Sequence, residues 1–231
     1  DYFMRAELSK SKVVEGEQVV VSYYLYRRVS IFNKEVSKYP IFEGFLREDL
    51  DLPVLQNRDE SETVVVGGIP YRKELLARYA AYPLRDGKLS IDSMSLKFNY
   101  YNQRNSKSGD AEDGFGNDPF FRFFQPMTPK AAKIQSDVIQ LEVMSLPEQD
   151  KPASFTGAVG VFDIVGAVDR YSVKANEALT LTLKIEGRGN INAFKEPKIN
   201  LPDSVEVYES KSKARTSKAG VGEKIFETDD A

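Results

Sequence analysis

Hydrophobic and polar residues alternate with a period of two along several stretches of this chain. In residues 19–25 every second residue is Val, Tyr or Leu, and in residues 179–186 apolar residues alternate strictly with Thr, Lys and Glu. This period is typical of β-strands that bury one face, and no stretch shows a convincing helical period. The pattern therefore predicts an all-β fold in which one face of residues 179–186 is solvated.

Other segments carry further strand and turn signals. Additional strands are predicted at Tyr2–Leu8, Thr63–Val66, Ile69–Leu84, Leu89–Phe98 and Asp137–Ser145. Leu75-Leu76 marks a bulge inside the longest of these strands, and the register changes near Asp92. The sequence Arg85-Asp86-Gly87-Lys88 is a strong turn signal. Many short strands of this kind predict a two-sheet sandwich of immunoglobulin type.

The strand pattern at the start of the chain is repeated about 160 positions later, where Ile164 corresponds to Met4. Val168 then corresponds to Leu8, and Glu177 corresponds to Glu17. Because the register holds over roughly 25 residues, a duplicated domain explains the pattern better than chance. The sequence therefore predicts tandem immunoglobulin-like β-sandwich domains.

The predicted domain organisation has three parts. They are a sandwich at residues 1–146 with an insertion at about 99–133, a linker at 147–154, and a second sandwich at 155–231. Two prolines and several charged residues give the linker its polar, irregular character. Nothing in the second copy corresponds to the Asp86-Gly87 turn or to the strand Asp137–Ser145, so we expect that copy to be incomplete and the chain to be a fragment of a longer protein.

Composition removes several kinds of chemistry. The chain has no Cys and no His, which excludes thiolate nucleophiles, disulfides and the usual transition-metal ligands. A net charge of −3 without a basic stripe argues against nucleic-acid binding. No apolar run is long enough to cross a bilayer, and no signal peptide precedes the first strand. No spacing of Ser, Thr, Lys, Asp or Glu indicates a catalytic set, so we expect a non-catalytic protein without cofactor or metal.

The insertion at about 99–133 is the most unusual segment. Its second half is dense in phenylalanine: Phe115, Phe120, Phe121, Phe123 and Phe124. One interpretation is a docking finger whose rings enter a groove on a partner protein. The other is that the rings fold back and cover a sheet face of their own domain.

Three other segments have a functional and a structural interpretation. Oxygen ligands for calcium are available in the insertion at Asp110, Glu112, Asp113, Asn117 and Asp118, but their spacing matches no EF-hand and a solvated turn is favoured. The sequence Gly187-Arg188-Gly189-Asn190 is interpreted as a strand-end turn rather than a phosphate cradle, because no helix follows it. A basic run is interpreted as a mobile, solvated loop rather than a lipid-binding patch: Lys211, Lys213, Arg215 and Lys218.

Several motifs together resemble the BatD family, the aerotolerance-linked (oxygen-tolerance) proteins of the bacterial envelope. They are Glu43-Gly44-Phe45, Tyr82-Pro83-Leu84 with Gly87-Lys88-Leu89-Ser90-Ile91, Asp118-Pro119-Phe120-Phe121, Leu146-Pro147 with Phe155-Thr156-Gly157-Ala158-Val159-Gly160, and Gly187-Arg188-Gly189-Asn190-Ile191 with Pro197 and Pro202. The pair of glycine-containing motifs at residues 155–160 and 187–191 is the most specific part of the resemblance.

The resemblance implies tandem immunoglobulin-like domains on the periplasmic side of the inner membrane and an anchor further along the chain. It also implies von Willebrand A-domain partners from the same operon and a role in stress response, and it implies no catalytic residues. The alternative function is a carbohydrate-binding or adhesin-like surface module. Its stacking surface would come from the tyrosines of the strands: Tyr23, Tyr24, Tyr26, Tyr71, Tyr79 and Tyr82.

Overall fold

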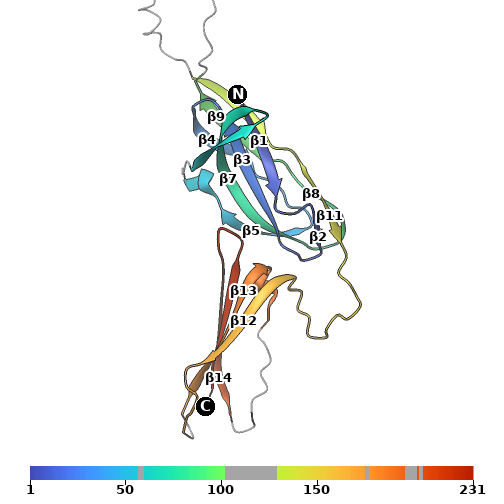
Figure 1. Cartoon of the computed structure of the whole chain (residues 1–231), viewed down its shortest axis with the longest axis vertical. Coiled ribbons are helices and arrows are strands. Elements are labelled where there is room, and N and C mark those ends of the chain that lie inside the picture. The colour runs from blue at the N-terminus through green and yellow to red at the C-terminus, as the bar shows by residue number, and fades with distance from the viewer. Residues whose placement is uncertain (57–59, 102–128, 175–176, 196–201, 203–204, 231) are drawn as a thin grey trace, which may run out of the picture.

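A computed structural model describes the chain except for residues 57–59, 102–128, 175–176, 196–201, 203–204 and 231. The fold is all-β and contains several antiparallel sheets, as the two-residue period predicts. The sheets of residues 2–144 lie at one end of an elongated molecule, and the sheet of residues 160–230 lies at the other (Figure 1). Among the described residues, no helix is both long and apolar enough to cross a bilayer.

The first layer of the N-terminal sheets is built around two long neighbouring strands. Its order is β1 (Tyr2–Leu8), β3 (Val19–Arg27), β7 (Ile69–Pro83) and β5 (Phe45–Asp51), and β6 (Ser61–Val66) also pairs with β7. The 3-10 turn η1 (Pro53–Gln56) follows β5. The predicted bulge is confirmed, because Tyr23 pairs with Ala77 while Tyr24 pairs with Leu75, which leaves Leu76 as the extra residue.

The second layer consists of two three-stranded sheets. One has the order β10 (Lys130–Gln135), β9 (Ser95–Tyr100) and β4 (Ile31–Lys38), and the other has the order β2 (Lys12–Val14), β11 (Ile139–Met144) and β8 (Gly87–Ile91). The predicted register change near Asp92 is the break between β8 and β9. Ser136 lies in the matching break between β10 and β11, and its N–H donates to the Met94 carbonyl over 2.9 Å.

One apolar core lies between these two layers, and we call the whole unit of β1–β11 the N-terminal sandwich. Tyr23 and Leu25 of the first layer and Ile91, Leu96 and Phe98 of the second are buried in it. Burial of each such side chain stabilises the fold by roughly 1.5–3 kcal/mol. The alternating residues of β3 therefore supply one wall of the core, as the sequence pattern predicts.

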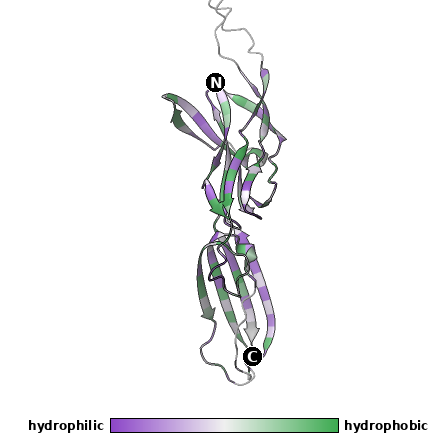
Figure 2. Ribbon diagram, turned by 90° about the vertical axis from the view of Figure 1, so that its right-hand side faces the viewer, coloured by the Kyte–Doolittle hydropathy of each residue, from purple (hydrophilic) through white to green (hydrophobic). Residues whose placement is uncertain are grey.

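The remaining strands form the C-terminal sheet. Its order is β12 (Gly160–Val168), β13 (Leu179–Gly189), β15 (Gly222–Asp230) and β14 (Val207–Thr216). Hydrophobic and hydrophilic residues alternate along β13, and both kinds of residue are present across the sheet (Figure 2). The apolar face buries Ile185 and Phe226 beside Ile191, which belongs to the short turn η2 (Ile191–Ala193), but Ile164 on the same face is 63% exposed.

Two sequence-based expectations differ from the structure. The segment between the strands β9 and β10 is residues 101–129, because residues 99–100 and 130–133 of the expected insertion belong to those two strands. The basic run is not a loop: Lys211, Lys213 and Arg215 lie on β14, which pairs with β15, and only Lys218 lies in the turn that follows.

Candidate functional site

The phenylalanine cluster predicted as a docking site lies outside the residues that the structure describes. This applies to Phe115, Phe120, Phe121, Phe123 and Phe124, and equally to the calcium candidates Asp110, Glu112, Asp113, Asn117 and Asp118. In the described part of the chain, no group of three acidic residues is placed to hold a metal ion.

The tyrosines proposed as a stacking surface are packed into the N-terminal sandwich. Tyr23, Tyr26, Tyr79 and Tyr82 are buried, whereas Tyr24 and Tyr71 are half-buried. Burial raises the pKa of the Tyr79 hydroxyl to about 12. Because none of the six rings is exposed, these residues act in packing, and the carbohydrate interpretation gains no support from them.

The glycine motif at residues 187–190 forms the end of β13, as the strand-end interpretation predicts. Gly189 has φ +152°, and a Cβ atom there would lie 2.4 Å from the Phe162 ring and 2.5 Å from the Val159 carbonyl oxygen. The glycine is therefore required by the close approach of β12, and the motif fixes the register of the two strands.

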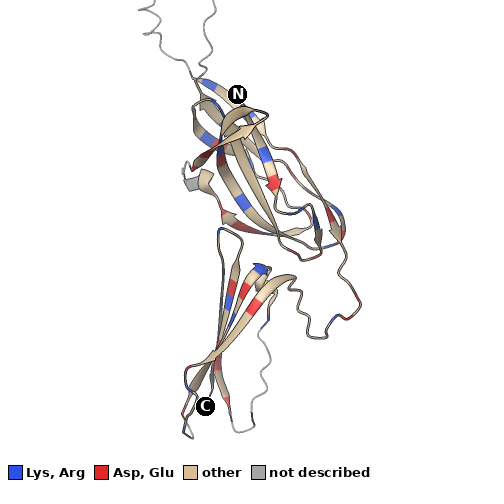
Figure 3. Ribbon diagram, in the orientation of Figure 1, with Lys and Arg blue, Asp and Glu red and all other residues tan. Residues whose placement is uncertain are grey.

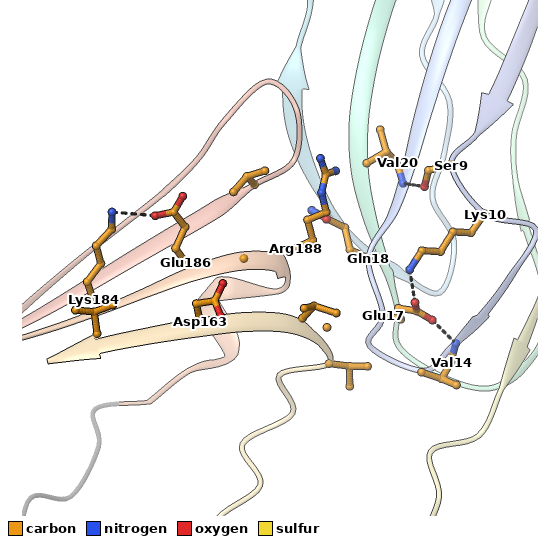
Figure 4. Close-up of a pocket in the computed structure, with 16 residues that line it drawn as sticks. Ser9, Lys10, Val14, Glu17, Gln18, Val20, Asp163, Lys184, Glu186 and Arg188 are labelled. Atoms are coloured by element: carbon orange, nitrogen blue, oxygen red, sulfur yellow. Dashed lines mark hydrogen bonds and ion pairs between the residues drawn. The ribbon is translucent and has the colours of Figure 1, made fainter.

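A cleft of about 830 Å³ lies between the N-terminal sandwich and the C-terminal sheet, and we call it the junction cleft (Figure 4). One wall comes from residues 9–20, which run from the end of β1 into β3. The other comes from residues 159–165 at the start of β12 and residues 184–188 of β13, together with Val221. The sequence analysis did not predict this cleft.

The N-terminal wall is ordered by the turn between β2 and β3. Gly16 adopts φ +78°, which brings Glu17 back toward Val14. The Glu17 carboxylate accepts hydrogen bonds from the Lys10 ammonium and, over 3.1 Å, from the Val14 N–H. Partial burial raises the pKa of Glu17, but these two donors outweigh it and hold the pKa below its ordinary value.

The C-terminal wall is the polar face of β12 and β13. In the antiparallel register Asp163 lies directly opposite Glu186, and Val165 lies opposite Lys184. The Lys184 ammonium forms ion pairs with Glu223 at 2.8 Å and with Glu186 at 2.9 Å, and these contacts raise its pKa. Basic and acidic residues therefore alternate along β13 in this wall, at Lys184, Glu186 and Arg188, and charged residues of both signs colour the sheet in Figure 3.

Two contacts hold the walls of the cleft together. At one end Glu17 forms a parallel β-bridge with Val159, the residue before β12. At the other end the turn between β14 and β15 rests on the sandwich: the Lys218 ammonium lies 3.3 Å from the Asp51 carboxylate, and Arg78 donates to the Lys218 carbonyl over 3.5 Å. The lining of the cleft includes Val159 near the first contact and Val221 near the second.

The chemical character of the cleft is mixed. Its walls combine valines with charged side chains that are mostly paired with one another. The Ser9 hydroxyl accepts a hydrogen bond from the Val20 N–H over 2.9 Å. Apolar patches with paired charges and free strand edges are typical of surfaces that bind extended segments.

The sequence contained one signal for this surface. Residues 160–168 read Gly-Val-Phe-Asp-Ile-Val-Gly-Ala-Val, a strand that is apolar on both faces, unlike its alternating neighbour β13. No protein-family model matches the chain, and no curated protein matches it. The geometry and the residues therefore carry the functional argument.

Proposed function

We propose that this chain is a non-catalytic protein–protein interaction module built from two immunoglobulin-like domains. The order of the strands in the sheets supports the two-domain part of this proposal. The first layer of the N-terminal sandwich and the C-terminal sheet share one arrangement, β1-β3-β7-β5 and β12-β13-β15-β14. This corresponds to the A-B-E-D sheet of the immunoglobulin fold, and β4 with β8–β11 supply the C, F and G positions of the facing sheet.

We further propose that the module belongs to a BatD-like protein on the periplasmic side of the inner membrane, acting in aerotolerance or stress response. Its partners would be von Willebrand A-domain proteins of the same envelope. The proposal is supported by the order of the motifs at residues 43–45, 82–91, 155–160 and 187–191. Two of these motifs, at residues 155–160 and 187–191, contribute to the junction cleft.

The observation that carries the interaction function is exposed apolar surface at the junction cleft. Val161 is 80% exposed and Val165 is 62% exposed, and both line the cleft beside the free edge of β12. Apolar surface gathered beside paired charges, in a concave site, is a feature of binding surfaces.

Site-specific photo-crosslinking in cells tests this function. A photoreactive residue at Val161 of the full-length protein should capture von Willebrand A-domain proteins. The same residue at Val65, an exposed position on β6 outside the cleft, is the matched control and should capture far less. Equal capture from both positions, or no protein captured from Val161, would contradict the proposal.

A further inference from the structure

The strand β12 is an edge strand without the usual protection. It carries a single charged residue, Asp163, among its 9 residues. The opposite edge of the same sheet, β14, alternates charged residues with Ser or Ala from Glu209 to Arg215. Soluble proteins normally protect edges with charges, prolines or bulges, so a long apolar edge is available for pairing with another strand.

The backbone of β12 offers regularly spaced hydrogen-bonding groups on that edge. Just past the strand end, the Asp169 N–H donates to the Thr180 carbonyl over 3.1 Å. Because bonded and non-bonded pairs alternate in an antiparallel ladder, Asp163 and Val165 turn their backbone groups toward β13. Phe162, Ile164 and Gly166 therefore direct their N–H and C=O groups outward.

One backbone segment of the chain already pairs next to this strand. Glu17 pairs in parallel with Val159, the residue that precedes β12. The chain then turns away into β3, so the edge beyond Val159 takes no further strand from the described residues. The outer edge of β12 is therefore available to an incoming segment.

The charged residues beside the edge indicate which charge the incoming segment should carry. Asp163 faces Glu186 across the ladder, and like charges in directly opposite positions destabilise a sheet. Glu186 is paired with Lys184 at 2.9 Å, whereas Asp163 has no ion-pair partner among the described residues. A Lys or Arg on an added strand, opposite Asp163, would neutralise this carboxylate from the outer side (Figure 4).

We infer that the free edge of β12 binds an extended segment of a partner protein by strand addition. The segment places a basic residue beside Asp163, apolar residues beside Val161 and Val165 on the cleft side, and apolar residues beside Ile164 on the other face. This inference rests on the proposed interaction function and names the partner's chemistry: an extended apolar strand with a central basic residue.

Synthetic peptides test the inference on the 231-residue chain. The probe is a peptide of alternating Val and Thr with a central Lys, added to about millimolar concentration while backbone amide resonances are followed by NMR, since a single added strand binds weakly. We expect shifts in β12. Replacing the central Lys by Glu should weaken binding about two- to fivefold. N-methylation of alternate peptide nitrogens should abolish binding, because it removes the ladder donors.

Two variants separate strand addition from a folding defect. Asp163→Lys should reverse the preference, so that the Glu peptide binds more tightly than the Lys peptide, while the melting temperature stays close to that of the parent chain. Ile164→Pro removes an outward N–H without removing a bond to β13, and it should abolish binding of both peptides.

The outcomes that overturn the inference are specific. It fails if the N-methylated peptide binds as well as its parent, or if resonances outside β12 and the cleft are the ones that shift. It also fails if β12 resonances shift with protein concentration alone, because the occupant is then a second copy. If Val161 captures a partner protein but the peptides do not bind, the inference is wrong and the proposed function still holds. If the peptides bind but Val161 captures no partner protein, the proposed function is wrong and strand addition at β12 still holds.

Discussion

At the scale of single residues, Glu74 places a carboxylate in the core of the N-terminal sandwich. Its side chain is buried, with the Lys34 ammonium on one oxygen and the Arg27 Nε 3.4 Å from the other. Desolvation makes such groups weak contributors to net stability, but removal of one partner leaves the others uncompensated. The cluster therefore makes folding depend on a residue that no apolar pattern would identify.

The first prediction concerns this cluster. Glu74→Ala should lower the free energy of unfolding by about 3–5 kcal/mol, because it leaves a buried guanidinium and an ammonium without their carboxylate. Glu62→Ala, at an exposed position on β6, should change it by less than about 0.5 kcal/mol. Urea unfolding at pH 7 measures both, and similar small losses for the two variants would contradict the account.

The second prediction concerns Glu17 in the cleft wall. Since its pKa is held below the ordinary 4.5, its stabilisation is present above pH 4.5 and is lost as the pH falls through the lower folded-state pKa. Glu17→Gln should therefore be less stable than the parent by about 1 kcal/mol at pH 7, and this difference should shrink as the pH falls below 4.5. A stability difference that does not change with pH would show that the ionised carboxylate is not responsible.

At the scale of elements, alternation and turn chemistry predicted β3, β7, β11 and β13, the turn before β8 and the bulge at Leu76. The sequence analysis did not predict β5, β10 and β14, because these strands lack that pattern. In β5 and β10 few apolar residues alternate, and β14 has no apolar face at all. These strands form because neighbours supply their ladder bonds, which is a tertiary effect that local sequence does not encode.

The third prediction tests the close contact of β12 with β13. Gly189→Ala should destabilise the C-terminal sheet by about 1–3 kcal/mol, because its Cβ meets the Phe162 ring and a backbone oxygen at φ +152°. Gly166→Ala is the control, since its Cβ meets only the end of the Leu183 side chain at 3.2 Å. Thermal unfolding of both variants measures the difference, and a Gly189→Ala chain as stable as the control would refute the packing argument.

At the scale of the whole molecule, the junction cleft was not predictable from the sequence. Its walls come from residues more than a hundred positions apart, and its geometry depends on the turn of residues 217–221 resting on β5 and β7. The repeated strand pattern was visible in the sequence because it is local. The angle at which the sandwich and the C-terminal sheet meet depends on contacts such as Lys218 with Asp51, which no periodicity marks.

The fourth prediction concerns that contact. Lys218→Glu places a second carboxylate near Asp51 and should loosen the junction, which small-angle X-ray scattering would detect as a broader distribution of interatomic distances. Lys213→Glu makes the same change in net charge on exposed β14 and should leave the distribution unchanged. Identical scattering from both variants would mean that the turn does not fix the arrangement.

The measurement that bears most directly on the interaction function is amide hydrogen exchange of β12 with and without the captured envelope partner. The outward N–H groups of Phe162, Ile164 and Gly166 should exchange more slowly in the complex, because a partner strand bonds to them. Protection confined to other segments, or no change in β12, would contradict the central claim that this edge and its cleft form the binding site.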